Sequence, residues 1–125
     1  MARRDISGAV DFAYLENYAA HDQAIIAEVL TIFREQSGMW MRLLDPEAPA
    51  GHWRDGAHTM KGAALGVGAV QLGEACAAAE AGAEGSPAQR MALLERVRTA
   101  LDAALSDIAA YQHEQALQSL RTPRA

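Results

Sequence analysis

Residues 86–112 read SPAQRMALLERVRTALDAALSDIAAYQ. The first four letters have the form of a capping box, in which Ser86 and Gln89 satisfy each other's backbone N–H groups, and Pro87 occupies the first helical position. The apolar residues that follow step by three and four positions, as in the seam of a coiled coil: Leu94, Val97, Leu101, Ala104, Ile108 and Tyr111. This pattern predicts a long helix that buries one face against partner helices.

Three more amphipathic segments precede this stretch. One begins near Asp22 and stops at Pro46, one begins after Gly51 and stops at the glycines 66 and 68, and one runs from about residue 69 to Gly82. A short helix opens at Asp11, which is a suitable N-cap. The segment that begins near Asp22 carries apolar residues at helical spacing that we expect to face the core, among them Ile25, Ile26, Leu30, Phe33, Leu43 and Leu44.

Short connections place sequential helices antiparallel to one another. We therefore predict an all-α fold, an up-down-up-down four-helix bundle with a short N-terminal capping helix. The predicted division of the chain is an N-terminal tail over residues 1–9, one domain over 10–118 and a C-terminal tail over 119–125. A chain of 125 residues, half of them apolar, has the size of one ordinary domain.

Charge and hydropathy exclude several classes of protein. The net charge of −5 argues against nucleic-acid binding, and Arg90, Arg96 and Arg98 are interpreted as parts of solvated helix faces. The longest apolar run, residues 62–70, is far shorter than the roughly 20 residues of a membrane span, and the start of the chain lacks the apolar core of a signal peptide. We expect a soluble, cytoplasmic protein in which the lone Cys76 is a small buried side chain.

The segment that begins after Gly51 contains an unusual turn, HTMKG, residues 58–62. A glycine inside a helix costs about 1 kcal/mol relative to alanine, so Gly62 needs a reason to be there. The core face of this helix is predicted to carry Trp53, Ala57, Met60 and Ala64. Helical spacing puts a second set of residues on the opposite face, beside His58: Arg54, Lys61, Gly62 and Leu65.

That face suits phosphoryl transfer. The imidazole of a histidine is largely neutral near pH 7 and can attack a phosphoryl group carried by another protein. Lys61 and Arg54 would offset the charge of the phosphoryl oxygens, and Gly62 would let the donor's backbone come close. The spacing alone leaves the alternative open that His58 is an ordinary surface or core residue, since histidine near lysine is common in helical bundles.

The other histidines supply no rival site. His21, His52 and His113 are isolated from one another along the chain, and no Glu-x-x-His pair of a di-iron bundle occurs. No glycine-rich phosphate loop is present either. We therefore expect no metal site, no nucleotide cofactor and no ATP-dependent kinase activity of the protein's own.

The stretch AHTMKGAALGVGAVQLGEACAAAE, Ala57 to Glu80, resembles the signature of histidine phosphotransfer (HPt) domains, the phosphoryl carriers of bacterial multistep phosphorelays. The resemblance covers roughly residues 10 to 112 and includes VDFAYLENY, which looks like the family's capping segment, and Phe33. Met60 replaces the family's usual leucine, and Ala63 and Ala64 stand where serines are frequent. Gly56 is less expected and is interpreted as loosening the turn that leads into the site.

The resemblance implies that His58 accepts a phosphoryl group on Nε2 from a receiver-domain aspartyl phosphate and passes it to another receiver. It implies charge stabilisation by Lys61, docking or clearance roles for Gly62, Arg54 and Leu65, and no cofactor except Mg²⁺ on the partner receiver. The expected partners of this monomer are response-regulator receiver domains and a hybrid histidine kinase, without nucleic acid or membrane. The alternatives are a helical docking adaptor for receiver or kinase domains that is not phosphorylated, and a small metal-binding bundle.

Overall fold

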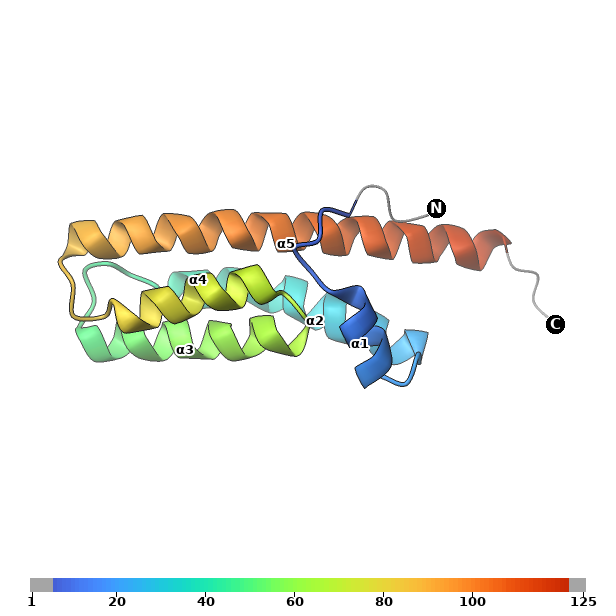
Figure 1. Cartoon of the computed structure of the whole chain (residues 1–125), viewed down its shortest axis with the longest axis horizontal. Coiled ribbons are helices and arrows are strands. Elements are labelled where there is room, and N and C mark those ends of the chain that lie inside the picture. Colours follow the sequence, from blue (N-terminus) through green and yellow to red (C-terminus); the bar gives the residue numbers. More distant parts are fainter. Residues whose placement is uncertain (1–5, 122–125) are drawn as a thin grey trace.

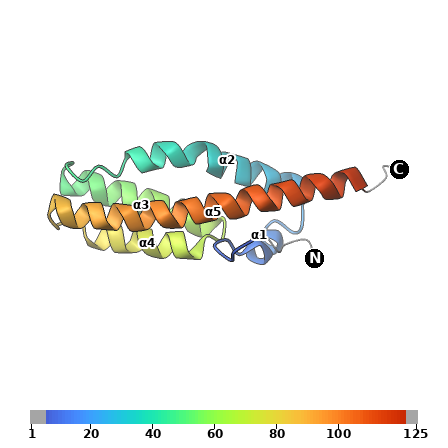
Figure 2. The same ribbon diagram turned by 90° about the horizontal axis from the view of Figure 1, so that it is seen from above.

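The computed structural model describes residues 6–121, and none of them forms a β-strand. The helices are α1 (Phe12–Tyr18), α2 (Gln23–Arg42), α3 (Ala50–Gly66), α4 (Val70–Ala81) and α5 (Pro87–Arg121). Helices α2 to α5 lie along one long axis in alternating directions, and α1 covers one end (Figure 1). The second view shows α5 running the full length of the bundle and continuing past the end of α3 and α4 (Figure 2). The predicted four-helix bundle with a capping helix is confirmed.

Side chains cap three of the helices as their sequences predict. The Asp11 carboxylate accepts a hydrogen bond from the backbone at the start of α1, and Asp22 does the same for α2. At the start of α5 the Gln89 side chain accepts from the Ser86 backbone N–H at 2.8 Å, and the Ser86 hydroxyl oxygen accepts from the Gln89 N–H at 3.1 Å. These bonds satisfy N–H groups that have no partner inside a helix.

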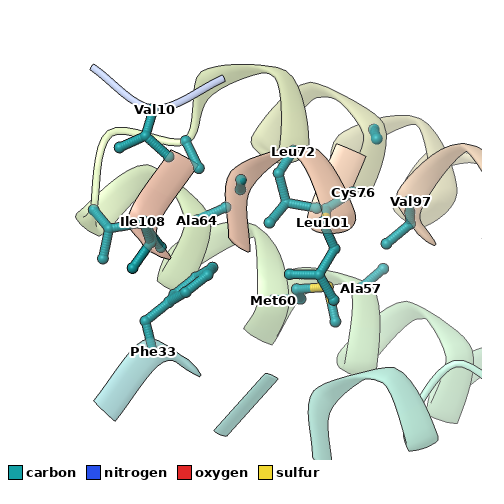
Figure 3. Close-up of a cluster of buried hydrophobic side chains, with 14 of the residues drawn as sticks. Val10, Phe33, Ala57, Met60, Ala64, Leu72, Cys76, Val97, Leu101 and Ile108 are labelled. Carbon is teal, nitrogen blue, oxygen red and sulfur yellow. The ribbon is translucent and has the colours of Figure 1, made fainter. Parts of the chain in front are cut away.

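All four long helices contribute to one apolar core, whose side chains point toward one another in Figure 3. The predicted seam of α5 is buried from Leu94 to Tyr111, and so is the predicted core face of α3. Cys76 is buried as expected, and this burial raises the pKa of its thiol to about 11. Ile25 and Leu43 were predicted to face the core but are exposed. Ile25 lies on the outer face of α2, and Leu43 follows the last residue of that helix, where its Cβ lies near Gly56 while much of its side chain stays exposed.

The segment before α1 is fixed to α5 by Asp107, whose side chain is buried with 1% exposure. Its carboxylate accepts hydrogen bonds from the backbone N–H groups of Ser7 at 2.8 Å, Gly8 at 3.1 Å and Val10 at 3.2 Å. Residues 7–9, predicted as tail, therefore contact the bundle, and residues 119–121 continue α5. Residues 1–5 and 122–125 of the predicted tails lie outside the described residues.

The N-terminal segment also holds the turn between α3 and α4. The Asp11 N–H donates to the Gly68 carbonyl at 2.9 Å. Gly68 has a φ of +82°, and a Cβ there would lie 2.8 Å from the Asp11 carbonyl oxygen. Only glycine fits both the backbone conformation and the space, so this turn has a fixed geometry just beyond the end of α3.

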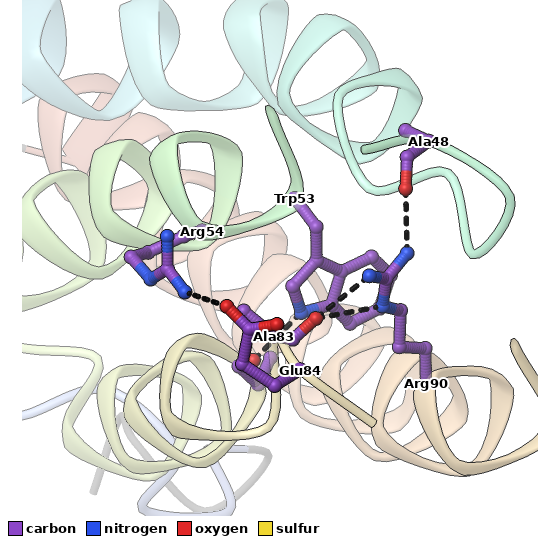
Figure 4. Close-up of polar contacts among 7 residues, drawn as sticks. Ala48, Trp53, Arg54, Ala83, Glu84 and Arg90 are labelled. Atoms are coloured by element: carbon purple, nitrogen blue, oxygen red, sulfur yellow. Dashed lines mark hydrogen bonds and ion pairs between the residues drawn. The ribbon is translucent and has the colours of Figure 1, made fainter. Parts of the chain in front are cut away.

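Two sequence interpretations are wrong because the residues concerned are buried. Arg90 is not part of a solvated face: it is 7% exposed, and its guanidinium donates to the Pro46 carbonyl. It also donates to the carbonyls of Ala83 and Ala48 (Figure 4). Gly56 does not loosen α3, because a Cβ there would lie only 2.9 Å from Leu43 Cβ. It is a position where the end of α2 packs closely on α3.

None of the helices between residues 6 and 121 has both the length and the apolar character needed to cross a lipid bilayer.

Candidate functional site

His58 lies in the middle of α3 on the face turned away from the core. Its neighbours Ala57 and Met60 are fully buried, whereas the His58 side chain is 68% exposed. The helical periodicity of α3 therefore separates the imidazole from the core, as the sequence predicted. The ring is accessible to another protein.

The Glu80 carboxylate on α4 is shared between two residues of α3. One oxygen, Oε2, lies 3.0 Å from His58 Nδ1, and the other, Oε1, lies 2.9 Å from Lys61 Nζ. An ionised carboxylate can only accept hydrogen bonds, so the neutral imidazole that bonds it carries its hydrogen on Nδ1. This assignment leaves the Nε2 lone pair free and directed away from Glu80.

The environment keeps Glu80 ionised. The hydrogen bond from Lys61 is the largest cause that lowers the carboxyl pKa from its ordinary value of 4.5, and the hydrogen bond with His58 lowers it further. Partial burial opposes these effects by disfavouring the charged form. The net direction is downward, so the carboxylate is an acceptor at neutral pH.

Gly62 leaves the space next to His58 open. A Cβ built on Gly62 meets no atom within 4 Å, in contrast to the closely packed Gly56 and Gly68. Packing within the chain therefore gives no reason for a glycine at position 62. Gly51 and Gly66 of the same helix are equally open, so the clearance role expected for Gly62 stays a prediction.

The structure places Arg54 and Leu65 at the border of the site. Arg54 Nη2 pairs with Glu84 at 2.9 Å, and both side chains are well exposed. Leu65 is exposed and lies against Gly73 of α4, where an added Cβ would come within 2.7 Å of its Cδ2. Lys61 is thus the cation that shares a carboxylate with His58, whereas Arg54 is held by a different acid.

Sequence reasoning gave Glu80 no role, although a signal for it exists. Positions 58 and 80 both lie 11 residues from position 69, and positions 54 and 84 both lie 15 residues from it. Residue 69 is in the turn between α3 and α4. In an antiparallel helix pair, residues equally distant from the turn come to lie opposite one another. The chain symmetry about this turn therefore predicts both the His58–Glu80 and the Arg54–Glu84 contacts.

In the described part of the chain, no three His, Cys, Asp or Glu side chains are grouped so that they could hold a metal ion. His52, the histidine nearest to His58 in sequence, is exposed near the start of α3. The site is therefore built from one imidazole, one carboxylate and one ammonium group.

The lowered pKa of Glu80 makes the stability of the fold depend on acid pH. Because the folded-state pKa lies below 4.5, the ionised carboxylate stabilises the fold above about pH 4.5, and this contribution is lost as pH falls through the folded-state value. We expect Glu80→Gln to lower the melting temperature by about 2–5 °C at pH 7. The difference in melting temperature between wild type and Glu80→Gln should become smaller as the pH of the unfolding experiment is lowered from 4.5 to 3.

Glu84→Gln is the matched control, because the Arg54–Glu84 pair is exposed and contributes little. A gap between wild type and Glu80→Gln that stays constant down to pH 3 would show that the Glu80 charge is not what stabilises the fold.

Comparison with known proteins identifies the family. Residues 28–111 match the model of the Hpt domain. The crystal structure of the histidine phosphotransferase ShpA from Caulobacter crescentus is 60% identical in sequence and superposes with a TM-score of 0.74, covering 91% of this chain and 100% of that chain. A search of curated protein sequences gives no match. The resemblance seen in the sequence is confirmed, and the chain belongs to the Hpt domain family.

Proposed function

We propose that His58 accepts a phosphoryl group on Nε2 from the aspartyl phosphate of a receiver domain and then passes it to an aspartate of another receiver. Membership of the Hpt family gives the protein a histidine phosphotransfer role in a phosphorelay. The observation that supports His58 as the acceptor is its exposed ring, bonded through Nδ1 to an acceptor-only carboxylate at 3.0 Å.

The chemistry of the transfer follows from this arrangement. The Nε2 lone pair attacks phosphorus, an N–P bond forms, and the P–O bond to the receiver's aspartate breaks, so that the carboxylate leaves with the bonding electrons. The hydrogen on Nδ1 stays in place. The positive charge that develops on the ring is spread onto Nδ1–H, which faces the Glu80 carboxylate. The reverse steps pass the phosphoryl group to the next receiver.

The residues around His58 divide the remaining tasks. Lys61 offsets the negative charge of the phosphoryl oxygens, since its ammonium group is already held beside the ring by Glu80. Gly62 gives the receiver's backbone access, and Leu65 and Arg54 contact the receiver around the rim of the site. Mg²⁺ belongs to the receiver, so the carrier needs no cofactor of its own.

Receiver domains and a hybrid histidine kinase are the proposed partners, and the protein acts on them as a cytoplasmic monomer without binding nucleic acid or membrane. The protein carries phosphoryl groups between them and does not use ATP. The protein therefore needs to supply little more than an oriented nucleophile on a rigid helix.

The direct test of the proposal is phosphoryl transfer to the His58→Gln variant. Purified protein is mixed with a phosphorylated receiver domain, and its intact mass is followed with time. Wild type should gain one phosphoryl group that is lost in acid and kept in alkali. The His58→Gln variant should gain none while keeping its helical circular-dichroism spectrum, because the exposed ring adds nothing to the core.

His52→Gln is the matched control, since it removes another exposed histidine from the same helix, and it should behave as wild type. Binding of the receiver without any gain of mass on wild type would favour the docking adaptor instead.

Gly62→Ala tests the clearance role. Alanine is the better helix former by roughly 0.5–1 kcal/mol, and the position has room for a methyl group, so thermal stability should rise. Transfer should become slower because the methyl group occupies the approach to His58. Stopped-flow or quenched single-turnover transfer, run beside thermal unfolding, measures both effects. Faster or unchanged transfer in a stabilised variant would remove the argument for clearance.

A further inference from the structure

The end of α4 that carries Glu80 has almost no side chains to anchor it. Residues 75–83 read ACAAAEAGA, and Glu80 is the only side chain among them larger than that of cysteine. In most helices, large apolar side chains fit between those of neighbouring helices and fix how far the helix is shifted and rotated. Alanines can pack closely but give little such fixation, so another contact must set where Glu80 lies.

Trp53 supplies one such contact. Its indole Nε1 donates to the Ala79 carbonyl at 2.7 Å in a fully buried environment. Ala79 directly precedes Glu80, and its carbonyl lies in the last turn of α4, where it also accepts from the Gly82 backbone N–H at 3.2 Å. The bond therefore ties the backbone next to Glu80 to α3, the helix that also carries His58 five residues further along.

Arg90 supplies the second contact. Its Nε and Nη2 donate to the Ala83 carbonyl at 3.1 and 2.7 Å, three residues beyond Glu80. The guanidinium carbon also lies 5.6 Å from the centroid of the Trp53 ring, and Figure 4 shows the two side chains side by side next to Ala83. Charged hydrogen bonds in a buried site are strong. The backbone is thus held on both sides of Glu80, at Ala79 and at Ala83.

The exposed ion pair of the same helix end does not replace these contacts. Arg54 and Glu84 have side chains that are 44% and 81% exposed, and such pairs contribute little. The distance from His58 Nδ1 to Glu80 Oε2 is 3.0 Å, and hydrogen bonds weaken rapidly beyond about 3.2 Å. A displacement of α4 smaller than its rise of about 1.5 Å per residue is enough to break this bond.

We propose that Trp53, supported by Arg90, is a positioning residue for phosphotransfer: its indole hydrogen bond to Ala79 keeps Glu80 in place against His58 Nδ1. The inference rests on the proposed role of His58 as the phosphoryl acceptor. Trp53 does not touch the reacting atoms. It acts through α4, so α3 provides both the nucleophile and the group that places the nucleophile's partner.

The test compares Trp53→Phe with a matched variant, Tyr111→Phe. Trp53→Phe removes the indole N–H and keeps an aromatic ring in the core. Tyr111→Phe likewise removes one hydrogen-bond donor from a buried aromatic residue, because the Tyr111 hydroxyl donates to Glu16 at 2.7 Å, far from His58 in the sequence and on another helix pair. The ring of Tyr111 keeps its stack on Phe12. All proteins are measured at the same interval below their own melting temperature.

The first readout is the tautomer of His58, taken from the ¹⁵N chemical shifts of its ring in the unphosphorylated protein. Trp53→Phe should shift population from the Nδ1–H form toward the Nε2–H form, and Tyr111→Phe should not. The second readout separates transfer from docking. Trp53→Phe should slow single-turnover phosphoryl transfer about tenfold and leave the receiver's dissociation constant within about twofold, since misplacement of catalytic groups by about 1 Å can lower a rate by about 100-fold.

Equal tautomer populations and equal transfer rates in the two variants would overturn the proposal and leave Trp53 as a core residue only. If Trp53→Phe does not fold, Arg90→Lys takes its place, because lysine keeps the charge but cannot bond Ala83 with two N–H groups. The His58 tautomer and the rate of phosphoryl transfer are then measured in Arg90→Lys, and they test the proposal in the same way. The tautomer measurement needs no phosphoryl donor, so failure of His58 to accept a phosphoryl group would be seen separately from failure of Trp53 to position Glu80.

Discussion

The close packing of α3 against α4 is the contact on which the site depends. Alanines line both sides of it, so the helix axes come near enough for one glutamate on α4 to reach two residues of α3. Glu80 meets His58 at 3.0 Å and Lys61 at 2.9 Å. The carboxylate fixes the hydrogen of the neutral ring on Nδ1, and in the proposed transfer this leaves Nε2 as the nucleophile. The chemistry proposed for the site follows from the approach of these two helices.

Close packing by small residues has a physical drawback, which the chain offsets with polar contacts. Small side chains bring helices together but hold their relative shift weakly. The buried Arg90 and the indole of Trp53 bond backbone carbonyls around the end of α4, and Asp107 does the same for the N-terminal segment on α5. In each case a buried side chain bonds the backbone of another segment, which gives a rigid frame for an exposed histidine.

The sequence predicted the features that depend on local chemistry and periodicity. The capping box at Ser86, the buried seam of α5 and the exposed position of His58 follow from residue type and spacing alone. The roles of Arg90 and Gly56 could not be predicted in this way. Backbone carbonyls of the loop before α3 and of the loop before α5 satisfy the arginine, and the close approach of Leu43 explains the glycine. Such partners leave no pattern in the sequence. The contact of Glu80 with His58 could be predicted in part. Both residues are equally far in sequence from the turn between α3 and α4, and this places them opposite each other once the two helices are known to be antiparallel.

We propose that Glu80 presents Nε2 of His58 as the phosphoryl acceptor. The most direct measurement is a heteronuclear NMR spectrum of the phosphorylated protein, with ¹⁵N-labelled histidine, that identifies which ring nitrogen carries phosphorus. We expect phosphorus on Nε2 of His58 and a hydrogen on Nδ1 bonded to Glu80. Phosphorus on Nδ1 of His58, or on a different histidine, would contradict it.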